Sequence, residues 1–460
     1  MKRESFGSRL GFILVSAGCA IGIGNVWKFP YICGAYGGAA FILIYLLFLI
    51  ILGIPVLVCE FAVGRGSRKS VALSFDELQP KNGKWAPLKF IGIIGCYMLM
   101  MFYTTVGGWL MYYCYKGIRG SFVNASSDNI STQFSQMLTD VPTMLFWTIL
   151  ICVIGFAVCM FGLNNGIERV TKVMMTALIL IMVVLAIRSV TMAGAGEGIR
   201  FYLIPDFHKM VESGIGNVVF AALSQAFFTL SIGIGAMLIF GSYLDQSRSL
   251  TGEAVNIMLL DTFVALTAGF IIIPACFAYG IEPGAGPSLI FITLPNIFAQ
   301  MSGGRIWAFL FFLFLTFAAL STIIAVFENL VMFNMELLGW RRKKSVLVCA
   351  TLIIILSIPC VLGFNVWSGV QLLGEGSTIM DLEDFIVSNN LLPLGSLGYV
   401  LFCTRKNGWG WDAFIKEVNT GSGMKFPKTL RGYVSYGIPA IIIVIYLKGY
   451  YDKFKDMGTG

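Results

Sequence analysis

The feature that most constrains this chain is a series of long apolar segments, separated by short polar stretches. A helix of about 20 apolar residues spans the hydrocarbon core of a bilayer. In that solvent a helix satisfies all of its own backbone N–H and C=O groups. We therefore predict an all-α polytopic membrane protein with eleven transmembrane helices. The expected segments are 9–34, 39–63, 90–118, 143–162, 166–190, 213–241, 252–279, 304–338, 345–363, 377–403 and 430–449.

The composition agrees with a bilayer environment. Of the 460 residues, 57% are hydrophobic and 12% are charged, which is about half the charged share of a soluble domain. The 11 cysteines lie within or at the ends of apolar segments and form no CxxC pair, so we interpret them as packing residues. The single histidine, His208, lies in an expected loop. With no metal cluster and no nucleophile beside a base, the sequence predicts that the protein is not an enzyme.

The basic residues predict the orientation, because cytoplasmic loops collect Lys and Arg. More than half of the 32 Lys and Arg residues lie in the N-terminal segment and in the loops 64–89, 341–344 and 404–431. We expect these regions to be cytoplasmic in a multi-pass protein of the cell (inner) membrane. An odd number of helices then places the C-terminus outside. The net charge of +8 follows from this bias, so it indicates no nucleic-acid partner. We expect the lipid bilayer as a partner and a monomeric protein.

Two of the expected helices are interrupted midway. The first contains AGCAIGIGNVWKFP at residues 17–30, and the sixth contains TLSIGIG at residues 229–235. These helices begin two blocks of five, and interrupted helices in corresponding positions indicate a transporter with inverted repeats. We expect one transporter domain, 1–460, with pseudo-repeats 9–190 and 213–403 and an extra helix 430–449.

An unwound helix exposes N–H and C=O groups at membrane depth, where only protein, water or a ligand can satisfy them. The N-terminal end of a half-helix attracts an anion, and free carbonyls coordinate cations. Two facing breaks therefore predict a joint site for a carboxylate and Na⁺. The alternative is that the glycines only allow close helix packing. Polar residues beside both breaks, among them Asn25 and Thr229, favour the binding site.

Four motifs carry a resemblance to a known family. AGCAIGIGNVWKFPY, GGAAFILIYLLFLIILGIPVLVCEFAVGR, FFTLSIGIG and ITLPNIFAQMSGG resemble, in this order, the motifs of the neurotransmitter:sodium symporter family in its bacterial, eleven-helix branch. The resemblance covers nearly the whole chain. It implies a LeuT-type fold, with a 5+5 inverted repeat and one extra C-terminal helix, that couples Na⁺ entry to amino-acid uptake by alternating access.

The resemblance implies two Na⁺ sites. The first uses the carbonyl of Ala20, the side chains of Asn25 and Thr229, and a polar residue of helix 7. The family usually has asparagine there, which suggests Asn256, but Asp261 lies more than two turns into the helix, near the midplane. Because an ionisable residue at that depth is functional by default, we choose Asp261 and keep Asn256 as the alternative. The second site comprises Gly18, Ile21, Ala318, Ser321 and Thr322.

The resemblance also implies a substrate pocket at the break in helix 1. The N–H groups of Ile23 and Gly24 and the hydroxyl of Tyr103 would hold a carboxylate. Family members that carry monoamines have an aspartate where this chain has Gly22, so the site suits an L-amino acid. Its side chain would be surrounded by Leu99, Phe228, Ser231, Ile234, Thr322 and Val326. This largely apolar wall favours hydrophobic or aromatic side chains.

Charged residues at the two ends of the pathway predict two gates. Outside, Lys28 would pair with Asp384 at the start of helix 10. Inside, Arg3 would pair with Glu336 at the end of helix 8, with Tyr243 nearby.

The sequence thus predicts a symporter that imports hydrophobic or aromatic L-amino acids with two Na⁺ ions. We expect transport to be chloride-independent, because Asp261 already supplies a negative charge beside the first Na⁺. One alternative is a proton-coupled carrier on the same scaffold, with Asp261 as the proton site. Another is an amino-acid sensor that binds its ligand without transporting it.

Overall fold

The computed structural model describes residues 4–281 and 288–457, which fold into helices joined by short connections. In chain order the helices are α1 (Arg9–Ala20), α2 (Phe29–Ala35), α3 (Ala39–Phe48), α4 (Ile54–Ser67), α5 (Val71–Leu78), α6 (Leu88–Arg119), α7 (Ser127–Thr139), α8 (Val141–Met160), α9 (Arg169–Val190), α10 (Ala195–Leu203), α11 (Phe207–Glu212), α12 (Ile215–Thr229), α13 (Ala236–Tyr243), α14 (Leu250–Ala278), α15 (Leu294–Gln300), α16 (Gly304–Leu338), α17 (Arg342–Leu362), α18 (Ile379–Ile386), α19 (Leu392–Thr404), α20 (Trp411–Val418) and α21 (Ile438–Met457). Single π-helical turns adjoin several of them, namely η1 (Gly24–Lys28), η2 (Leu49–Gly53), η3 (Leu163–Glu168), η4 (Leu289–Thr293), η5 (Val387–Leu391) and η7 (Tyr433–Gly437).

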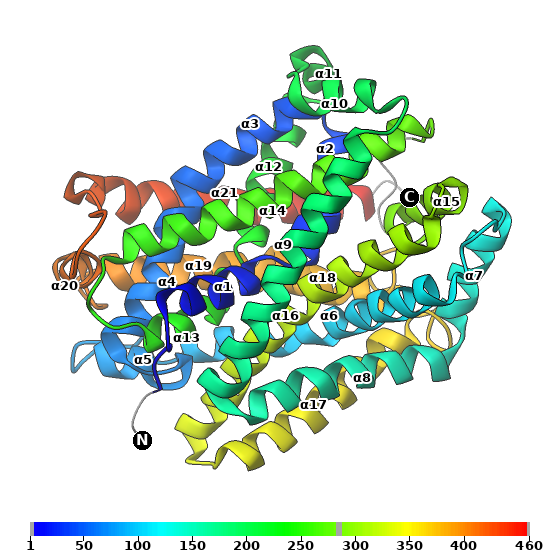
Figure 1. Cartoon of the computed structure of the whole chain (residues 1–460). Coiled ribbons are helices and arrows are strands. Elements are labelled where there is room, and N and C mark those ends of the chain that lie inside the picture. The colour runs from blue at the N-terminus through cyan, green and yellow to red at the C-terminus, as the bar shows by residue number, and fades with distance from the viewer. Residues whose placement is uncertain (1–3, 282–287, 458–460) are drawn as a thin grey trace.

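The helices form one bundle with two distinct ends (Figure 1). Helices α5, α13 and α20 lie at the end where the chain begins, which we call the N-terminal side. Helices α7, α10, α11 and α15 lie at the other end, which we call the opposite side.

Nine helical stretches among the described residues are long and apolar enough to cross a membrane. They are Ala39–Ser67, Leu88–Arg119, Val141–Met160, Leu163–Val190, Leu250–Ala278, Gly304–Leu338, Arg342–Leu362, Ile379–Thr404 and Lys428–Tyr451. A tenth crossing joins α1 to the segment Gly24–Ala35 and is bent by 58°. Helices α12 and α13, of 15 and 8 residues, occupy the place of the sixth expected crossing, and each is too short to cross alone. This architecture is consistent with the eleven predicted crossings.

Both predicted interruptions are present. The first crossing loses its α-helical pattern over residues 21–23, between α1 and η1. The sixth is open over residues 230–235, where Ser231, Gly233 and Gly235 have φ angles of 50°, 102° and 76°. These left-handed conformations cannot continue a right-handed helix. The sequence TLSIGIG therefore breaks the crossing where two of its glycines permit positive φ.

The two breaks lie in the interior of the bundle. Helix α1 packs against α9, α14 and α16, and α13 packs against α4. Ile21, Ile232 and Ile234 are each fully buried. The backbone N–H and C=O groups that the two breaks leave free are thus surrounded by protein and kept away from lipid, which cannot form hydrogen bonds with them.

Candidate functional site

A small cavity lies between the two breaks and collects most of the predicted substrate residues. Its lining comprises Ala20, Gly22, Gly24, Leu99, Tyr103, Phe228, Ser231, Ile234, Thr322 and Leu392. Leu392, at the start of α19, is a lining residue that the sequence did not predict. Val326, which we expected there, is buried on α16 but does not line the cavity. The cavity volume is only about 20 Å³, which is room for a single water molecule, so side chains fill the pocket in this conformation.

Tyr103 connects α6 to the break in the first crossing. Its hydroxyl accepts a hydrogen bond from the N–H of Ile23 at 2.9 Å. A β-carbon on Gly22 would lie 2.2 Å from this hydroxyl and 2.9 Å from the Thr322 hydroxyl. Glycine at position 22 is therefore what allows Tyr103 and Thr322 to approach the broken backbone. Similarly, a β-carbon on Gly24 would lie 2.7 Å from the Phe228 ring. The position of this ring therefore requires glycine at residue 24, and the predicted approach of a substrate to the Gly24 backbone would require it as well.

Oxygen atoms of the first break converge on Thr322 of α16. The Thr322 hydroxyl oxygen lies 3.3 Å from each of the carbonyl oxygens of Gly18, Cys19 and Ile21, and 3.4 Å from that of Ala318. A hydroxyl has one hydrogen and can donate to only one of these acceptors at a time. The neighbouring Ser321 hydroxyl donates to the carbonyl of Ala318 at 2.9 Å. This buried cluster has more oxygen acceptors than donors, which is the environment that a hard cation selects.

A second polar cluster surrounds Asp261 on α14, which is fully buried. The Asn25 side-chain amide donates to the Asp261 carboxylate at 2.8 Å, and the Thr229 hydroxyl donates to its other oxygen at 3.0 Å. These bonds bring together Asn25, Thr229 and Asp261, which are three of the four residues predicted for the first Na⁺ site. Ala20, the fourth, is buried and lines the adjoining cavity. The alternative, Asn256, lies more than one turn away on the same helix and is half-buried.

Three further polar residues support the breaks and were not among the predicted site residues. Gln225 donates to the carbonyl of Gly24 at 3.1 Å, and the Tyr45 hydroxyl donates to Thr229 at 3.4 Å. Glu60, on α4, accepts a hydrogen bond from the N–H of Gly233. All three side chains are buried within membrane crossings. A polar residue inside an apolar segment is the sequence signal that could have identified them.

The two residues predicted to form the outer gate line one cavity, but no ion pair joins them. Lys28 and Asp384 both line a cavity of about 370 Å³ on the opposite side, above Tyr103 and Phe228. Lys28 Nζ lies 4.2 Å from the centroid of the Phe228 ring, and Asp384 accepts a hydrogen bond from Ser388 at 2.7 Å. No nitrogen–oxygen contact within 4.0 Å joins these two described residues. Lys28 thus packs on the aromatic ring instead of the carboxylate, which a cation–π contact allows.

The predicted inner gate is only partly within the described residues, because Arg3 lies outside them. Glu336 accepts hydrogen bonds from the N–H and the hydroxyl of Ser70, both at 2.7 Å. Tyr243, expected nearby, lines the same cavity as Glu336 and donates to Glu328 at 2.8 Å. Glu328 is fully buried and forms a two-point ion pair with Arg342, at 2.8 and 3.0 Å. This pair was not predicted from the sequence.

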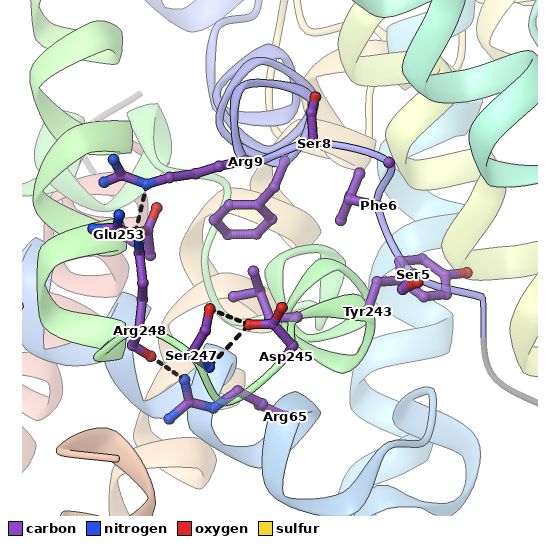
Figure 2. A pocket seen from close by; sticks show the side chains of 13 residues that line it. Ser5, Phe6, Ser8, Arg9, Arg65, Tyr243, Asp245, Ser247, Arg248 and Glu253 are labelled. Carbon is purple, nitrogen blue, oxygen red and sulfur yellow. Dashed lines mark hydrogen bonds and ion pairs between the residues drawn. The ribbon is translucent and has the colours of Figure 1, made fainter. Parts of the chain in front are cut away.

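The segment before α1 lies at the N-terminal side of the bundle, beside a cavity (Figure 2). It faces a cavity of about 310 Å³ that is lined by Ser5, Phe6, Gly7, Ser8, Arg9, Phe12, Arg65, Tyr243, Leu244, Asp245, Ser247, Arg248 and Glu253. Arg9 binds Glu253 of α14 at 3.0 Å. On the other flank, the Glu168 carboxylate accepts hydrogen bonds from the Gly7 N–H and the Ser8 hydroxyl at 2.8 and 3.1 Å. These contacts tie the start of the first crossing to the fifth and the seventh.

Comparison with known proteins finds relatives over nearly the whole chain. The chain matches the model of the sodium:neurotransmitter symporter family over residues 3–133 and 128–451. It is 35% identical over 448 residues to the uncharacterized sodium-dependent transporter YhdH of Bacillus subtilis, with 97% of each chain covered. It is 30% identical over 499 residues to the sodium-dependent serotonin transporter of Drosophila melanogaster, covering 97% of this chain and 76% of that protein.

A solved structure shows the same fold. The crystal structure of MhsT in complex with L-phenylalanine superposes with a TM-score of 0.87 and 35% sequence identity, and the superposition covers 97% of this chain and 100% of that chain. The predicted all-α, LeuT-type fold of a multi-pass membrane protein is therefore confirmed. The family match and the likeness to sodium-dependent transporters extend over nearly the whole sequence. The chain belongs to the sodium:neurotransmitter symporter family.

Proposed function

We propose that this protein is a sodium-coupled symporter that imports hydrophobic or aromatic L-amino acids by alternating access. The observation that carries this proposal is that carbonyl oxygens of the first crossing converge on Thr322, beside the hydrogen bond between Ile23 and Tyr103. It places groups suited to a cation next to groups suited to a carboxylate. One amino acid and its co-transported Na⁺ can therefore be bound by the same unwound segment.

The substrate class follows from the lining of the cavity. Leu99, Phe228, Ile234 and Leu392 supply an apolar wall, and the neighbour MhsT is a protein whose structure contains L-phenylalanine. Among the described residues, neither a basic nor an acidic side chain lines the cavity. With no basic side chain there, the ligand carboxylate must be satisfied by backbone N–H groups, the Tyr103 hydroxyl and Na⁺. Apolar pockets discriminate weakly between similar side chains, at about 1–3 kcal/mol per methylene, so we propose a class of substrates.

Na⁺ is a co-substrate in this proposal and occupies two places. Ala20, Asn25, Thr229 and Asp261 form the first site. The carbonyls of Gly18, Ile21 and Ala318 with the hydroxyls of Ser321 and Thr322 form the second. Both sets consist of oxygen donors and lie in buried parts of the described chain.

The distribution of Lys and Arg supports an orientation with the N-terminal side in the cytoplasm. The cavity beside Lys28 and Asp384 is then the outer vestibule, and Tyr103 and Phe228 separate it from the substrate cavity, since both residues line both spaces. In this assignment the contacts of Glu168 and Glu253 with the N-terminal segment close the cytoplasmic path.

Uptake into proteoliposomes tests the proposed function. Labelled L-phenylalanine and L-leucine should accumulate when an inward Na⁺ gradient is imposed, and accumulation should collapse when K⁺ replaces Na⁺. Uptake that follows a proton gradient without Na⁺ would establish the proton-coupled carrier instead. Saturable binding with no uptake would establish the sensor.

The second Na⁺ site gives a further prediction. Thr322→Ala and Ser321→Ala should each raise the Na⁺ concentration needed for half-maximal substrate binding by about 10- to 150-fold, because losing one ligand to a cation costs roughly 1.5–3 kcal/mol. Leu320→Ala is the control, since it truncates a buried neighbour on the same helix without removing an oxygen. Sodium titrations of substrate binding in the three variants measure the effect. Equal half-saturation values in all three would contradict a cation site at Thr322.

A further inference from the structure

Helix α18 carries three acidic residues with different surroundings. Asp381 and Asp384 line the outer vestibule, and each accepts a hydrogen bond, from Thr378 and Ser388 respectively. Glu383 does not line the vestibule. Its side chain is buried, with 2% of the residue exposed, and neither carboxyl oxygen has a hydrogen-bond partner among the described residues.

The elements packed against α18 offer no countercharge to this carboxyl. They are α6, α17 and α21, the last through contacts of Phe385 with Tyr450 and Phe454. The titratable group that adjoins Glu383 is the Cys360 thiol of α17, which in turn adjoins Thr105 of α6. No Lys or Arg of the described chain forms an ion pair with Glu383. An ionised carboxylate without a partner is very costly in such a site, whereas its neutral acid is much less so. In this conformation the surroundings of Glu383 therefore favour the neutral acid over the carboxylate.

The position of α18 links this proton to the outer gate. The helix carries the gate residue Asp384, and the π-helical turn η5 joins it to α19. Such turns replace regular helical hydrogen bonding and are frequent at functional sites. Because Asp381 and Asp384 already face a cavity of about 370 Å³, a small movement of α18 away from α6 would bring water from the vestibule to Glu383.

We propose that Glu383 is a proton-binding residue of the outer gate. It holds a proton while α18 packs on α6 and α17, and it releases that proton to vestibule water when α18 swings outward. The closed arrangement then binds one more proton than the open one. Acidification stabilises the closed vestibule, and the open vestibule gains population as the pH rises. The identification of this cavity as the outer vestibule rests on the proposed function, whereas the proton-linked movement of α18 does not.

A fluorescent reporter on α18 tests this proposal. Met380→Cys, at the rim of the vestibule, is labelled with bimane at neutral pH, and the fluorescence of the full-length protein is then followed from about pH 5.5 to 9, where exposed Asp and Glu do not titrate. We expect a reversible, single-proton transition. Glu383→Gln, which mimics the neutral acid, should hold the acidic signal across the whole range. Asp381→Asn is the matched control on the same helix and should keep the transition.

A transition that persists unchanged in Glu383→Gln would overturn the proposal, as would a parent protein whose signal does not respond to pH. Glu383→Met, an apolar side chain of similar length, provides a second variant if the glutamine form does not fold, and it too should lack the transition. The measurement uses no sodium gradient and no amino acid. A protein that fails to transport can therefore still show the α18 transition, and the two failures are distinguishable.

Discussion

Gly22→Ala is expected to weaken amino-acid binding by about 10- to 100-fold. The added methyl group would lie 2.2 Å from the Tyr103 hydroxyl and 2.9 Å from the Thr322 hydroxyl, far inside van der Waals contact. Overpacking of this kind costs about 1–3 kcal/mol, and each 1.4 kcal/mol is a factor of ten in affinity. The displaced Tyr103 would also lose its hydrogen bond from the Ile23 N–H. Equilibrium binding of labelled L-phenylalanine to the purified protein measures the change.

Two controls separate this clash from general damage. Gly216→Ala, on α12, adds the same methyl group where nothing lies within 4 Å and should bind normally. The double variant Gly22→Ala/Tyr103→Phe removes the atom that the methyl group meets first and leaves the contact with the Thr322 hydroxyl at 2.9 Å. Adding Gly22→Ala to Tyr103→Phe should therefore cost less affinity than adding it to the unmodified protein. If the two losses simply add, Gly22 and Tyr103 act independently and our account of the pocket is wrong.

The sequence allowed the bilayer, the two interruptions and their positions to be predicted. Each depends on a local signal, either the length of an apolar segment or a cluster of glycines inside one. Gly233 illustrates this, because its φ of 102° is a backbone state that glycine adopts without strain. Asp261 was also identifiable, since a carboxylate halfway along an apolar segment needs partners. The structure supplies those partners as Asn25 and Thr229.

Contacts between distant segments were harder to predict. Leu392 lines the cavity, but a leucine at the start of the apolar helix α19 looks like any other packing residue. Glu328 of α16 pairs with Arg342 at the start of α17. Many other basic residues lie on that side of the bundle, so the sequence alone does not show which of them Glu328 contacts. The expected pairing of Lys28 with Asp384 depends on the conformation of the gate. Here Lys28 finds an aromatic ring, and no sequence pattern distinguishes that arrangement from an ion pair.

Asp261→Asn is expected to reduce Na⁺ affinity by about 100-fold. The fully buried Asp261 carboxylate lies beside Asn25 and Thr229, where a unit charge at about 4 Å stabilises a cation by roughly 4 kcal/mol at an effective dielectric constant of 20. Part of that is offset by the cost of keeping the carboxylate buried when the cation leaves. Asn256→Ala, on the same helix, is the control and should change Na⁺ affinity less than threefold, roughly 0.6 kcal/mol. Sodium titrations of substrate binding compare the two variants, and the reverse order would identify Asn256 as the ligand.

The same carboxylate is expected to make chloride unnecessary for transport by the unmodified protein. A bound Na⁺ in a low-dielectric site needs a nearby negative charge, and Asp261 provides it without a mobile anion. Uptake should therefore proceed at the same rate when gluconate replaces chloride on both sides of the membrane. In Asp261→Asn that fixed charge is gone, so chloride should restore part of the lost activity while gluconate should not. An unmodified protein that is active in chloride but inactive in gluconate would show that Asp261 does not balance the charge of the transported Na⁺.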